Sequence, residues 1–211
     1  LSLLFISTIY AQYVPDILGD NYLRRTIQMP DDYEGKVVCT LVKKPQLPET
    51  KQAILYIHGY NDYFFQKQLG DSVNAHGYNF YAMDLRKYGR SILPNQNPFF
   101  CKSLKEYFAD LDTGLAIIRE EGNDKILLMA PSYAHSLLKQ FKGEWVYNTD
   151  WKMINGHPKK AGWINAIQEA QKTVQKGIGL DCPVLVISSN KSFPETKEWN
   201  NEYLSSDIVL D

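Results

Sequence analysis

The sequence predicts an α/β protein, because short apolar runs alternate along it with stretches of helical periodicity. Residues 53–57 read AILYI with no polar residue between them, which is typical of a strand covered on both faces. Residues 104–118 repeat apolar side chains at spacings of three and four, which is typical of a helix with one buried face. Together these patterns predict one domain built around a mostly parallel sheet.

Composition fits this class and argues against others. The 211 residues are 44% hydrophobic and 22% charged, which is ordinary for a soluble globular domain. A net charge of −1 without a run of Lys or Arg argues against nucleic acid as a partner. Cys39, Cys101 and Cys182 are too widely spaced for a zinc pattern or a disulfide framework. We expect them to be small buried apolar residues, with one disulfide left open, and we expect no metal and no cofactor.

The N-terminal residues have the pattern of a targeting segment. Residues 1–10 (LSLLFISTIY) are apolar but too short to span a bilayer, and the small residue Ala11 follows them. We expect residues 1–11 to be a signal-peptide remnant and residues 12–211 to be a single domain of an exported protein, periplasmic or secreted. The alternative is a first strand or buried arm of a cytoplasmic protein. We expect no transmembrane anchor.

The first half of the chain predicts a hairpin followed by two core strands. Strands are expected where β-branched and apolar residues cluster, at residues 22–29, 36–43, 53–57 and 78–83. The first two flank Pro30, Asp31 and Asp32, which favour a turn. A helix is expected over residues 63–76, with Gly77 ending it in a left-handed conformation.

The second half predicts three helices and two strands. The first helix begins at Ser103, and Glu106 completes a capping box. Its buried face is expected to carry Leu104, Phe108, Leu111, Leu115 and Ile118. Strands of the buried type are expected at residues 125–130 (KILLMA) and 184–187 (VLVI), and further helices at residues 163–175 and 194–203.

The first candidate site follows the strand at residues 53–57, where the chain reads His58-Gly59-Tyr60. A loop that leaves the carboxyl end of such a strand can aim a backbone N–H at a bound substrate, and an oxyanion hole needs a donor of this kind. The alternative is an ordinary strand-to-loop turn, in which His58 is a half-buried histidine whose nitrogens are hydrogen-bonded.

The second candidate site follows the next strand, where residues 84–91 read DLRKYGRS. Taken alone, Asp84 and Arg86 predict a buried salt-bridged corner. The running order of strand, His-Gly, helix, strand, Asp-Leu-Arg-x-x-Gly-x-Ser, helix and strand resembles the α/β-hydrolase superfamily over residues 16–130. Within that superfamily the chain is similar to lysophospholipases, monoacylglycerol lipases and serine aminopeptidases.

The resemblance implies a three-layer α/β-hydrolase sandwich. It also implies a helical lid that is partly missing and corresponds to about residues 131–181. The strands that precede the two candidate motifs should be neighbours in one parallel sheet, with Ile57 beside Met83.

The resemblance further implies roles for the motif residues. The oxyanion hole would be formed by the backbone at Gly59 and Tyr60, with the N–H of Tyr60 as the donor. The residues with an architectural role would be His58, Asp84, Arg86 and Gly89.

The candidate nucleophile is Ser132, in the sequence Ala130-Pro131-Ser132-Tyr133-Ala134. The family carries Gly-x-Ser-x-Gly at this place, because small residues let the serine sit on a tight, strained turn. This chain departs from that pattern, which makes Ser132 a weak candidate, and residues 133–170 resemble a stretch that follows the lid in related hydrolases. We therefore expect the usual turn, the helix behind it, the sixth strand of the family and most of the lid to be missing. The strands at residues 125–130 and 184–187 would then either pair with each other or leave an unpaired buried edge.

The other catalytic groups are incomplete in the sequence. Asn190 stands where the resemblance places the acid, with Asp207 and Asp211 as substitutes further on. An amide can orient an imidazole but cannot stabilise the imidazolium that forms during catalysis. The catalytic base is not found, since His76 and His157 have the surroundings of surface histidines.

Two functions follow from these observations. The first is a serine-type hydrolase of carboxylic acyl esters, acting on a small-molecule ester or lipid such as a lysophospholipid or monoacylglycerol. Aromatic residues suited to an acyl chain would then be a lid remnant, namely Trp145, Tyr147, Trp151 and Trp163. The alternative is a non-catalytic hydrolase-like fragment or binding protein that lacks the triad.

Overall fold

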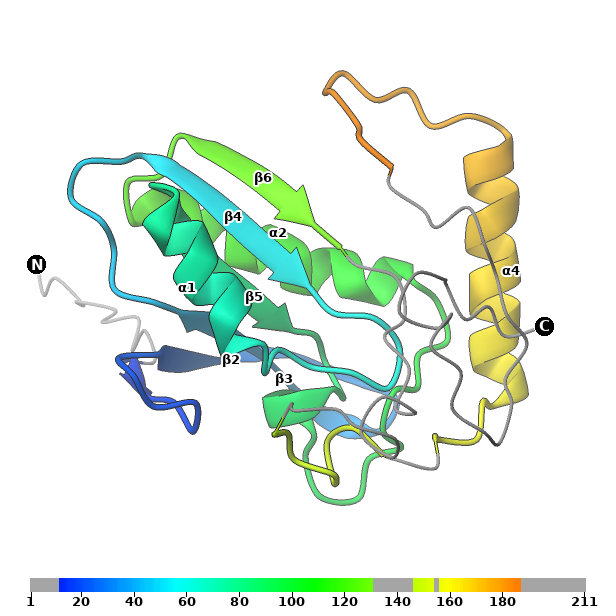
Figure 1. The fold of residues 1–211 in the computed structure, drawn as a ribbon. Helices are drawn as coiled ribbons and strands as arrows, with labels where there is room; N and C mark the ends of the chain where they lie inside the picture. The colour runs from blue at the N-terminus through cyan, green and yellow to red at the C-terminus, as the bar shows by residue number, and fades with distance from the viewer. Residues whose placement is uncertain (1–11, 131–145, 154–155, 187–211) are drawn as a thin grey trace, which may run out of the picture.

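The computed structural model describes residues 12–130, 146–153 and 156–186. Its core is a six-stranded mixed sheet with the order β1-β2-β3-β5-β4-β6 (Figure 1). The strands are β1 (Val14–Pro15), β2 (Leu23–Asp32), β3 (Gly35–Lys43), β4 (Gln52–Ile57), β5 (Asn79–Asp84) and β6 (Lys125–Met129). The helices are α1 (Lys67–Ala75), the short 3₁₀ helix η1 (Gly89–Ser91), α2 (Lys105–Glu120) and α4 (Ala161–Gln175).

Helices cover both faces of the central strands, which gives three layers (Figure 1). The side chains that pack with Val73 of α1 on one face are Ile54, Tyr56, Phe80 and Ala82. The side chains that pack with Tyr107, Ile117 and Ile118 of α2 on the other face are Ala53, Leu55, Tyr81 and Met83. Because both faces are covered, β4 and β5 are apolar at successive positions. The predicted three-layer α/β-hydrolase architecture is confirmed.

The two strands that precede the candidate motifs are neighbours, as predicted. β4 and β5 pair in parallel, with Ile57 opposite Met83. On its other side β4 pairs in parallel with β6, with Tyr56 opposite Met129. The carboxyl ends of β5, β4 and β6 therefore meet at one edge of the sheet, which is where open α/β sheets bind their ligands.

β2 and β3 form the predicted antiparallel hairpin, but the turn lies later than expected. β2 continues through Pro30 to Asp32, which pairs with Gly35 after an irregularity in the register. The Oδ1 atom of Asp32 accepts a hydrogen bond from the N–H of Glu34 at 2.7 Å and so closes the turn. Pro30 has no N–H to donate, and the irregularity accommodates it within the strand.

α1 is shorter than predicted. The helix begins only at Lys67, and residues 63–66 form an irregular, buried loop. Asp84 favours this loop over a helical turn, because its Oδ1 atom accepts a hydrogen bond from the N–H of Phe64 at 3.0 Å. The C-terminal end agrees with the prediction, since Gly77 has a φ of 81°.

α2 confirms most of the predicted buried face, since Ile118 is buried and Leu104, Leu111 and Leu115 pack against the core. Its buried residues are Tyr107, Asp110, Gly114, Ile117 and Ile118. Phe108 was predicted to be buried but is 58% exposed. Gly114 permits the observed face, because the Cε atom of Met83 occupies the place where a Cβ would project. The predicted capping box is present in part, since the N–H of Ser103 donates to Oε1 of Glu106 at 3.1 Å.

β6 is an exposed edge strand, although its sequence predicted a buried one. Among the strands of residues 12–130 it pairs only with β4. Leu127 and Leu128, whose side chains point to opposite faces, are 56% and 52% exposed. The prediction of a strand at residues 184–187 is also wrong for residues 184–186, the part that the structure describes. These residues form no strand and are exposed.

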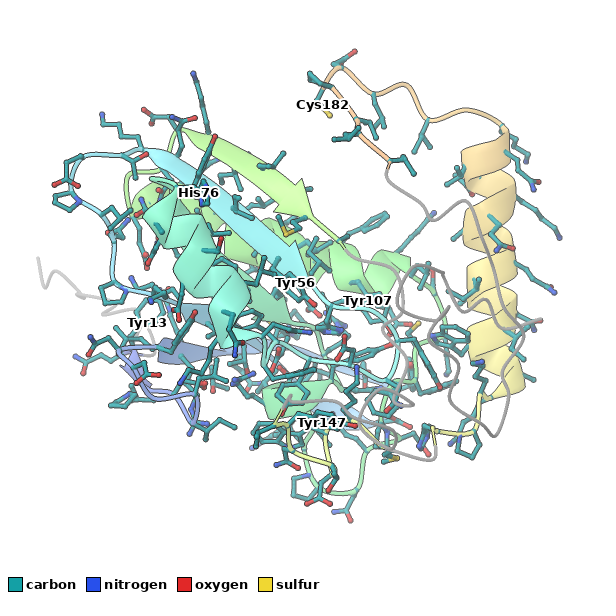
Figure 2. All side chains as sticks on the ribbon, viewed as in Figure 1. Tyr13, Tyr56, His76, Tyr107, Tyr147 and Cys182 are labelled. Atoms are coloured by element: carbon teal, nitrogen blue, oxygen red, sulfur yellow. The ribbon has the colours of Figure 1, made fainter. Side chains whose placement is uncertain are left out.

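α4 agrees with the helix predicted at residues 163–175 and begins slightly earlier. Its second half and the segment that follows it, up to Val186, are exposed to solvent. Cys182 lies on that segment (Figure 2) and is exposed, so the prediction of a buried cysteine is wrong here. Cys39 and Cys101 are buried, as predicted, and all three cysteines are free. None of the described helices has the length and hydropathy needed to cross a membrane.

Candidate functional site

His58 joins the two candidate motifs through its ring. It follows β4, and its Nε2 atom accepts a hydrogen bond from the N–H of Leu85 at 3.0 Å. An accepting Nε2 implies that the proton is on Nδ1, which lies 2.8 Å from the carbonyl of Gly59 and donates to it. The ring packs on Tyr88 with centroids 4.5 Å apart and is buried. Because both nitrogens are engaged, this geometry supports an architectural role for His58 rather than that of a base.

The hydrogen bond from His58 also orients the predicted oxyanion donor. The carbonyl of Gly59 and the N–H of Tyr60 belong to one trans peptide, so the two groups point in opposite directions. The N–H of Tyr60 therefore points away from the ring of His58. The side chain of Tyr60 packs on Trp163 of α4 with ring centroids 4.4 Å apart and on Phe99 at 5.6 Å. These rings cover part of the Tyr60 side chain, and Gly59 and Tyr60 are both half-buried.

Asp84 connects the loops that follow β4 and β5. Its buried carboxylate accepts hydrogen bonds from the N–H of Phe64 at 3.0 Å and from Nη1 of Arg90 at 2.8 Å. Arg90 donates through Nε and Nη2 to Asp16, both at 2.7 Å. Burial opposes the charge of Arg90, but Asp84 and Asp16 outweigh this effect and raise its pKa. One guanidinium thus bridges two carboxylates and fixes both loops.

The sequence suggested that Arg86 pairs with Asp84, but it does not. Its Nη2 atom donates to Oδ1 of Asp110 at 2.7 Å, and its backbone N–H donates to Oδ2 of the same residue at 2.9 Å. Asp110 lies on α2, on the opposite face of the sheet from α1. The predicted pairing fails because Arg90 and the N–H of Phe64 already occupy Asp84. Both motif residues are in buried ion pairs, but with partners that the sequence did not indicate.

Gly89 lies where no side chain fits. It has a φ of 48°, and a Cβ at this position would come within 2.5 Å of both Oδ2 of Asp84 and Cβ of Tyr63. Lys87, two residues earlier, also has a positive φ of 63°. Its buried ammonium lies 2.7 Å from a carboxylate oxygen of Asp32, in the β2–β3 hairpin. This geometry supports the architectural role predicted for Gly89.

Residues that the sequence did not assign hold the loop after β4. The N–H of Met153 donates to Oδ1 of Asn61 at 2.9 Å, and Nδ2 of Asn61 donates to the carbonyl of Met153 at 3.0 Å. Nζ of Lys152 donates to Oδ1 of Asp62 at 2.7 Å, and both side chains are 4% exposed. Burial raises the pKa of Asp62, although Lys152 opposes the shift. A lone lysine 90 residues away gives no sequence signal for this pair.

His157 is not the surface histidine that the sequence predicted. It is half-buried, and its ring packs edge-on against Phe99 with centroids 5.1 Å apart. Burial, and then repulsion from Lys160, lower its pKa. Phe99 also packs on the ring of Tyr60, so the side chains of His157 and Tyr60 contact the same ring. His76 is exposed at the end of α1, as predicted (Figure 2).

The remaining predicted site residues lie outside the described part of the chain. They are Ser132, Asn190, Asp207 and Asp211, together with Trp145 of the lid-like segment. The predicted signal-peptide remnant at residues 1–11 and the helix at residues 194–203 also lie outside it. Within the ranges that the structure does describe, no group of three His, Cys, Asp or Glu side chains is arranged to hold a metal ion.

Comparison with known families identifies the part of the chain that carries both motifs. Residues 48–137 match a family model described as serine aminopeptidase, S33. This range includes β4, α1, β5, α2 and β6. No curated protein sequence matches the chain at a significant level.

Several solved structures are similar to the chain. An epoxide hydrolase from an endophytic Streptomyces is 20% identical over 58% of this chain and 33% of its own, with a TM-score of 0.39. A soluble variant of monoglyceride lipase from Saccharomyces cerevisiae is 21% identical over 51% of this chain and 35% of its own, with a TM-score of 0.37. A carboxyl esterase from Bacillus coagulans is 16% identical over 53% of this chain and 36% of its own, with a TM-score of 0.39.

The chain therefore spans 33–36% of the length of these three proteins. The family match covers the parallel strands and both loops at their carboxyl ends. Over residues 48–137 the chain is therefore similar to the serine aminopeptidase, S33 family, which agrees with the resemblance that the two motifs indicated.

Proposed function

We propose that the protein is a serine-type hydrolase of carboxylic esters, with an acyl ester such as a monoacylglycerol or lysophospholipid as its substrate. The observation that carries the proposal is the common edge at which β5, β4 and β6 end. The loop after β4 carries Tyr60 at this edge, and the chain leaves β6 there, three residues before Ser132. Hydrolysis through an acyl-enzyme needs an oxyanion donor and a nucleophile on either side of one carbonyl group.

The surroundings of Tyr60 favour an apolar acyl group over a peptide. Phe99, which is buried, and Trp163 contact its ring, and the half-buried rings of Tyr60 and Trp163 offer aromatic surface to a hydrocarbon chain. An aminopeptidase, in contrast, needs an open carboxylate to bind the α-amino group of its substrate. The buried carboxylates of Asp62 and Asp84 are already paired with cations. An ester without a free amine is therefore the better substrate for this edge.

Ester turnover by the purified 211-residue protein tests the proposal. The substrates are p-nitrophenyl esters of increasing acyl length and a monoacylglycerol, with amino-acid p-nitroanilides as the amide comparison. We expect the esters to be hydrolysed, with kcat/KM rising from acetyl to medium-chain acyl groups. We expect Ser132→Ala to lower kcat/KM by at least about 10³-fold. The control is Ser72→Ala, on the exposed side of α1, which should leave turnover unchanged.

Each other outcome has a definite meaning. Full ester turnover by the Ser132→Ala variant would show that another serine is the nucleophile. Turnover of anilides alone would replace the ester substrate by an amide. Lack of turnover with every substrate would favour the alternative of a non-catalytic binding protein.

A further inference from the structure

The loop that carries the predicted oxyanion donor is held by a second segment. Residues 59–66 connect β4 to α1 and contain no helix or strand. Residues 147–153, which we call the strap, pack against this loop, and Tyr147 is labelled within the strap in Figure 2. Because the loop lacks the hydrogen bonds of regular structure, its conformation depends on the side chains that contact it.

The strap contacts four of the five loop residues from position 61 to position 65. The contacting pairs are Asn61 with Met153, Asp62 with Lys152, Tyr63 with Asn148 and Trp151, and Phe65 with Tyr147. The N–H of Asn148 donates to Oη of Tyr63 at 2.6 Å. The rings of Tyr63 and Trp151 pack edge-on with centroids 5.3 Å apart. Phe64, the remaining residue, is held by Asp84. The loop is thus held between the strap and the Asp84 corner.

Asn61 is held by hydrogen bonds from outside the loop. Its φ of 50° lies in the left-handed region that residues with a side chain rarely adopt. Its side chain makes a reciprocal pair of hydrogen bonds with the backbone of Met153, which holds this conformation in place. Asn61 directly follows Tyr60. The ring of His58 binds the peptide before Tyr60, and the strap binds the side chain of Asn61, the residue after Tyr60.

The ion pair between Asp62 and Lys152 ties the strap to the loop. Both side chains are buried, so removal of Lys152 takes this counter-ion away from the carboxylate of Asp62 in a place that water reaches poorly. Lys152 also lies over the ring of Phe65, with Nζ 5.3 Å from the ring centroid. The position of Lys152 is therefore set by several groups of the loop at once.

We propose that the strap positions the oxyanion donor: Lys152 through Asp62, and Met153 through Asn61, hold the peptide between Gly59 and Tyr60. This inference rests on the proposed function, because only an acyl-transfer site requires an oriented N–H at Tyr60. Lys152 is a positioning residue and not a catalytic one, since its Nζ atom donates to Asp62, and Asp62 lies two residues from Tyr60.

Hydrogen exchange of the full chain tests the structural part of the proposal without any substrate. We expect Lys152→Met to accelerate backbone exchange in residues 59–66 by about tenfold or more, with little change in β4 and β5. The matched control is Lys172→Met, because Lys172 is an exposed lysine on α4. It should change neither region. If Lys152→Met does not fold, the double variant Asp62→Asn/Lys152→Met, which removes both buried charges, carries the same expectation.

Steady-state ester hydrolysis tests the positioning role. A displaced donor should lower kcat by about tenfold or more while KM changes less than about threefold, because the oxyanion forms only after the substrate has bound. Lys152→Arg keeps the charge and should recover most of kcat. A protein in which Lys152 had only a structural role would lose active material without this change in kcat per active site.

The outcomes separate this inference from the proposed function. Unchanged exchange in residues 59–66 of the Lys152→Met variant would overturn the inference. Faster exchange with an unchanged kcat would overturn it as well, since the loop would then move without affecting the reaction. If the wild-type protein hydrolyses no ester, the proposed function fails, while the exchange measurement still decides whether the strap holds the loop.

Discussion

β4 and β6 are neighbouring strands with similar apolar sequences, yet they are buried to different extents. Leu55 of β4 is fully buried, whereas Leu128, its register partner in β6, is 52% exposed. β4 has a strand on each side, while β6 has one neighbour among the described strands. An apolar sequence allows a strand to be buried, but the strand is buried only where other strands and helices pack around it.

Residues 12–124 and the described residues from β6 onward differ in burial in the same way. From residue 12 to residue 124 the charged residues of the two motifs are buried in ion pairs, and both faces of the sheet are packed. From β6 onward, many apolar side chains are exposed, and the segment after α4 is exposed throughout. The later region contributes to the candidate site mainly through the strap and Trp163. Stability and site geometry should therefore respond very differently to substitutions in the two regions.

The largest effect is expected at the Asp84 corner. Asp84→Ala removes a buried partner of Arg90 and the acceptor for the N–H of Phe64, so it should lower the free energy of unfolding by about 4 kcal/mol. Asp124→Ala is the matched control, because the side chain of Asp124 is exposed and its carboxylate lies 3.9 Å from Nζ of Lys51. It should cost less than about 0.5 kcal/mol. Urea unfolding measures both variants, and equal losses would contradict the contrast between buried and exposed ion pairs.

A smaller effect is expected from a matched pair of leucines. Leu55→Ala should cost about 3 kcal/mol, because it leaves a cavity beneath α2. Leu128→Ala, at the adjacent position on the same face, should cost less than about 1 kcal/mol because Leu128 is half-exposed. The measurement is again urea unfolding. A cost at Leu128 equal to that at Leu55 would show that β6 is covered in solution.

The exposed edge should affect association more than stability. Replacing Leu127 and Leu128 by lysine should change the free energy of unfolding by no more than about 0.5 kcal/mol per residue and should reduce self-association, because charges block edge-to-edge pairing. Sedimentation velocity over a range of protein concentrations measures this. Phe108→Lys is the control, since Phe108 is an exposed apolar residue on a helix. An equal decrease in association with the control would mean that the strand edge has no special part in it.

The smallest effect is expected from the titration of His157. Its pKa in the folded protein is lower than the ordinary value of 6.5, so below about pH 6.5 the unfolded chain binds more protons than the folded one. Stability is therefore lost as the pH falls through this value. The Tm of the wild-type protein should fall between about pH 7.5 and pH 5.5. In the His157→Gln variant this fall should be smaller, by no more than about 1 °C. Thermal unfolding at the two pH values measures it, and a larger loss in the variant would contradict the direction of the pKa shift.

Much of the fold could be predicted because it depends on local patterns. The continuous apolar runs at residues 53–57 and 78–83 gave two strands covered on both faces, and Gly77 gave the end of α1. Residues 63–66 were predicted as the start of a helix, but they form a loop. Their conformation depends on Asp84, which no local pattern connects with Phe64.

The partners of charged residues could not be predicted from the sequence. Arg90 pairs with Asp16 across 74 residues, and Lys152 with Asp62 across 90 residues. Arg86 lies two residues from Asp84, but it binds Asp110 on α2. A carboxylate and a cation become partners when the folded backbone brings them together, and hydrophobic periodicity carries no information about that choice.

Covalent labelling most directly tests whether the loop after β4 serves a nucleophilic serine. The full chain is treated with a fluorophosphonate, and the intact protein and its peptides are weighed by mass spectrometry. An acyl-transfer site predicts one adduct per chain, on Ser132, formed more slowly when a medium-chain ester is present. No adduct, or an adduct that forms equally well on the urea-unfolded chain, would contradict this.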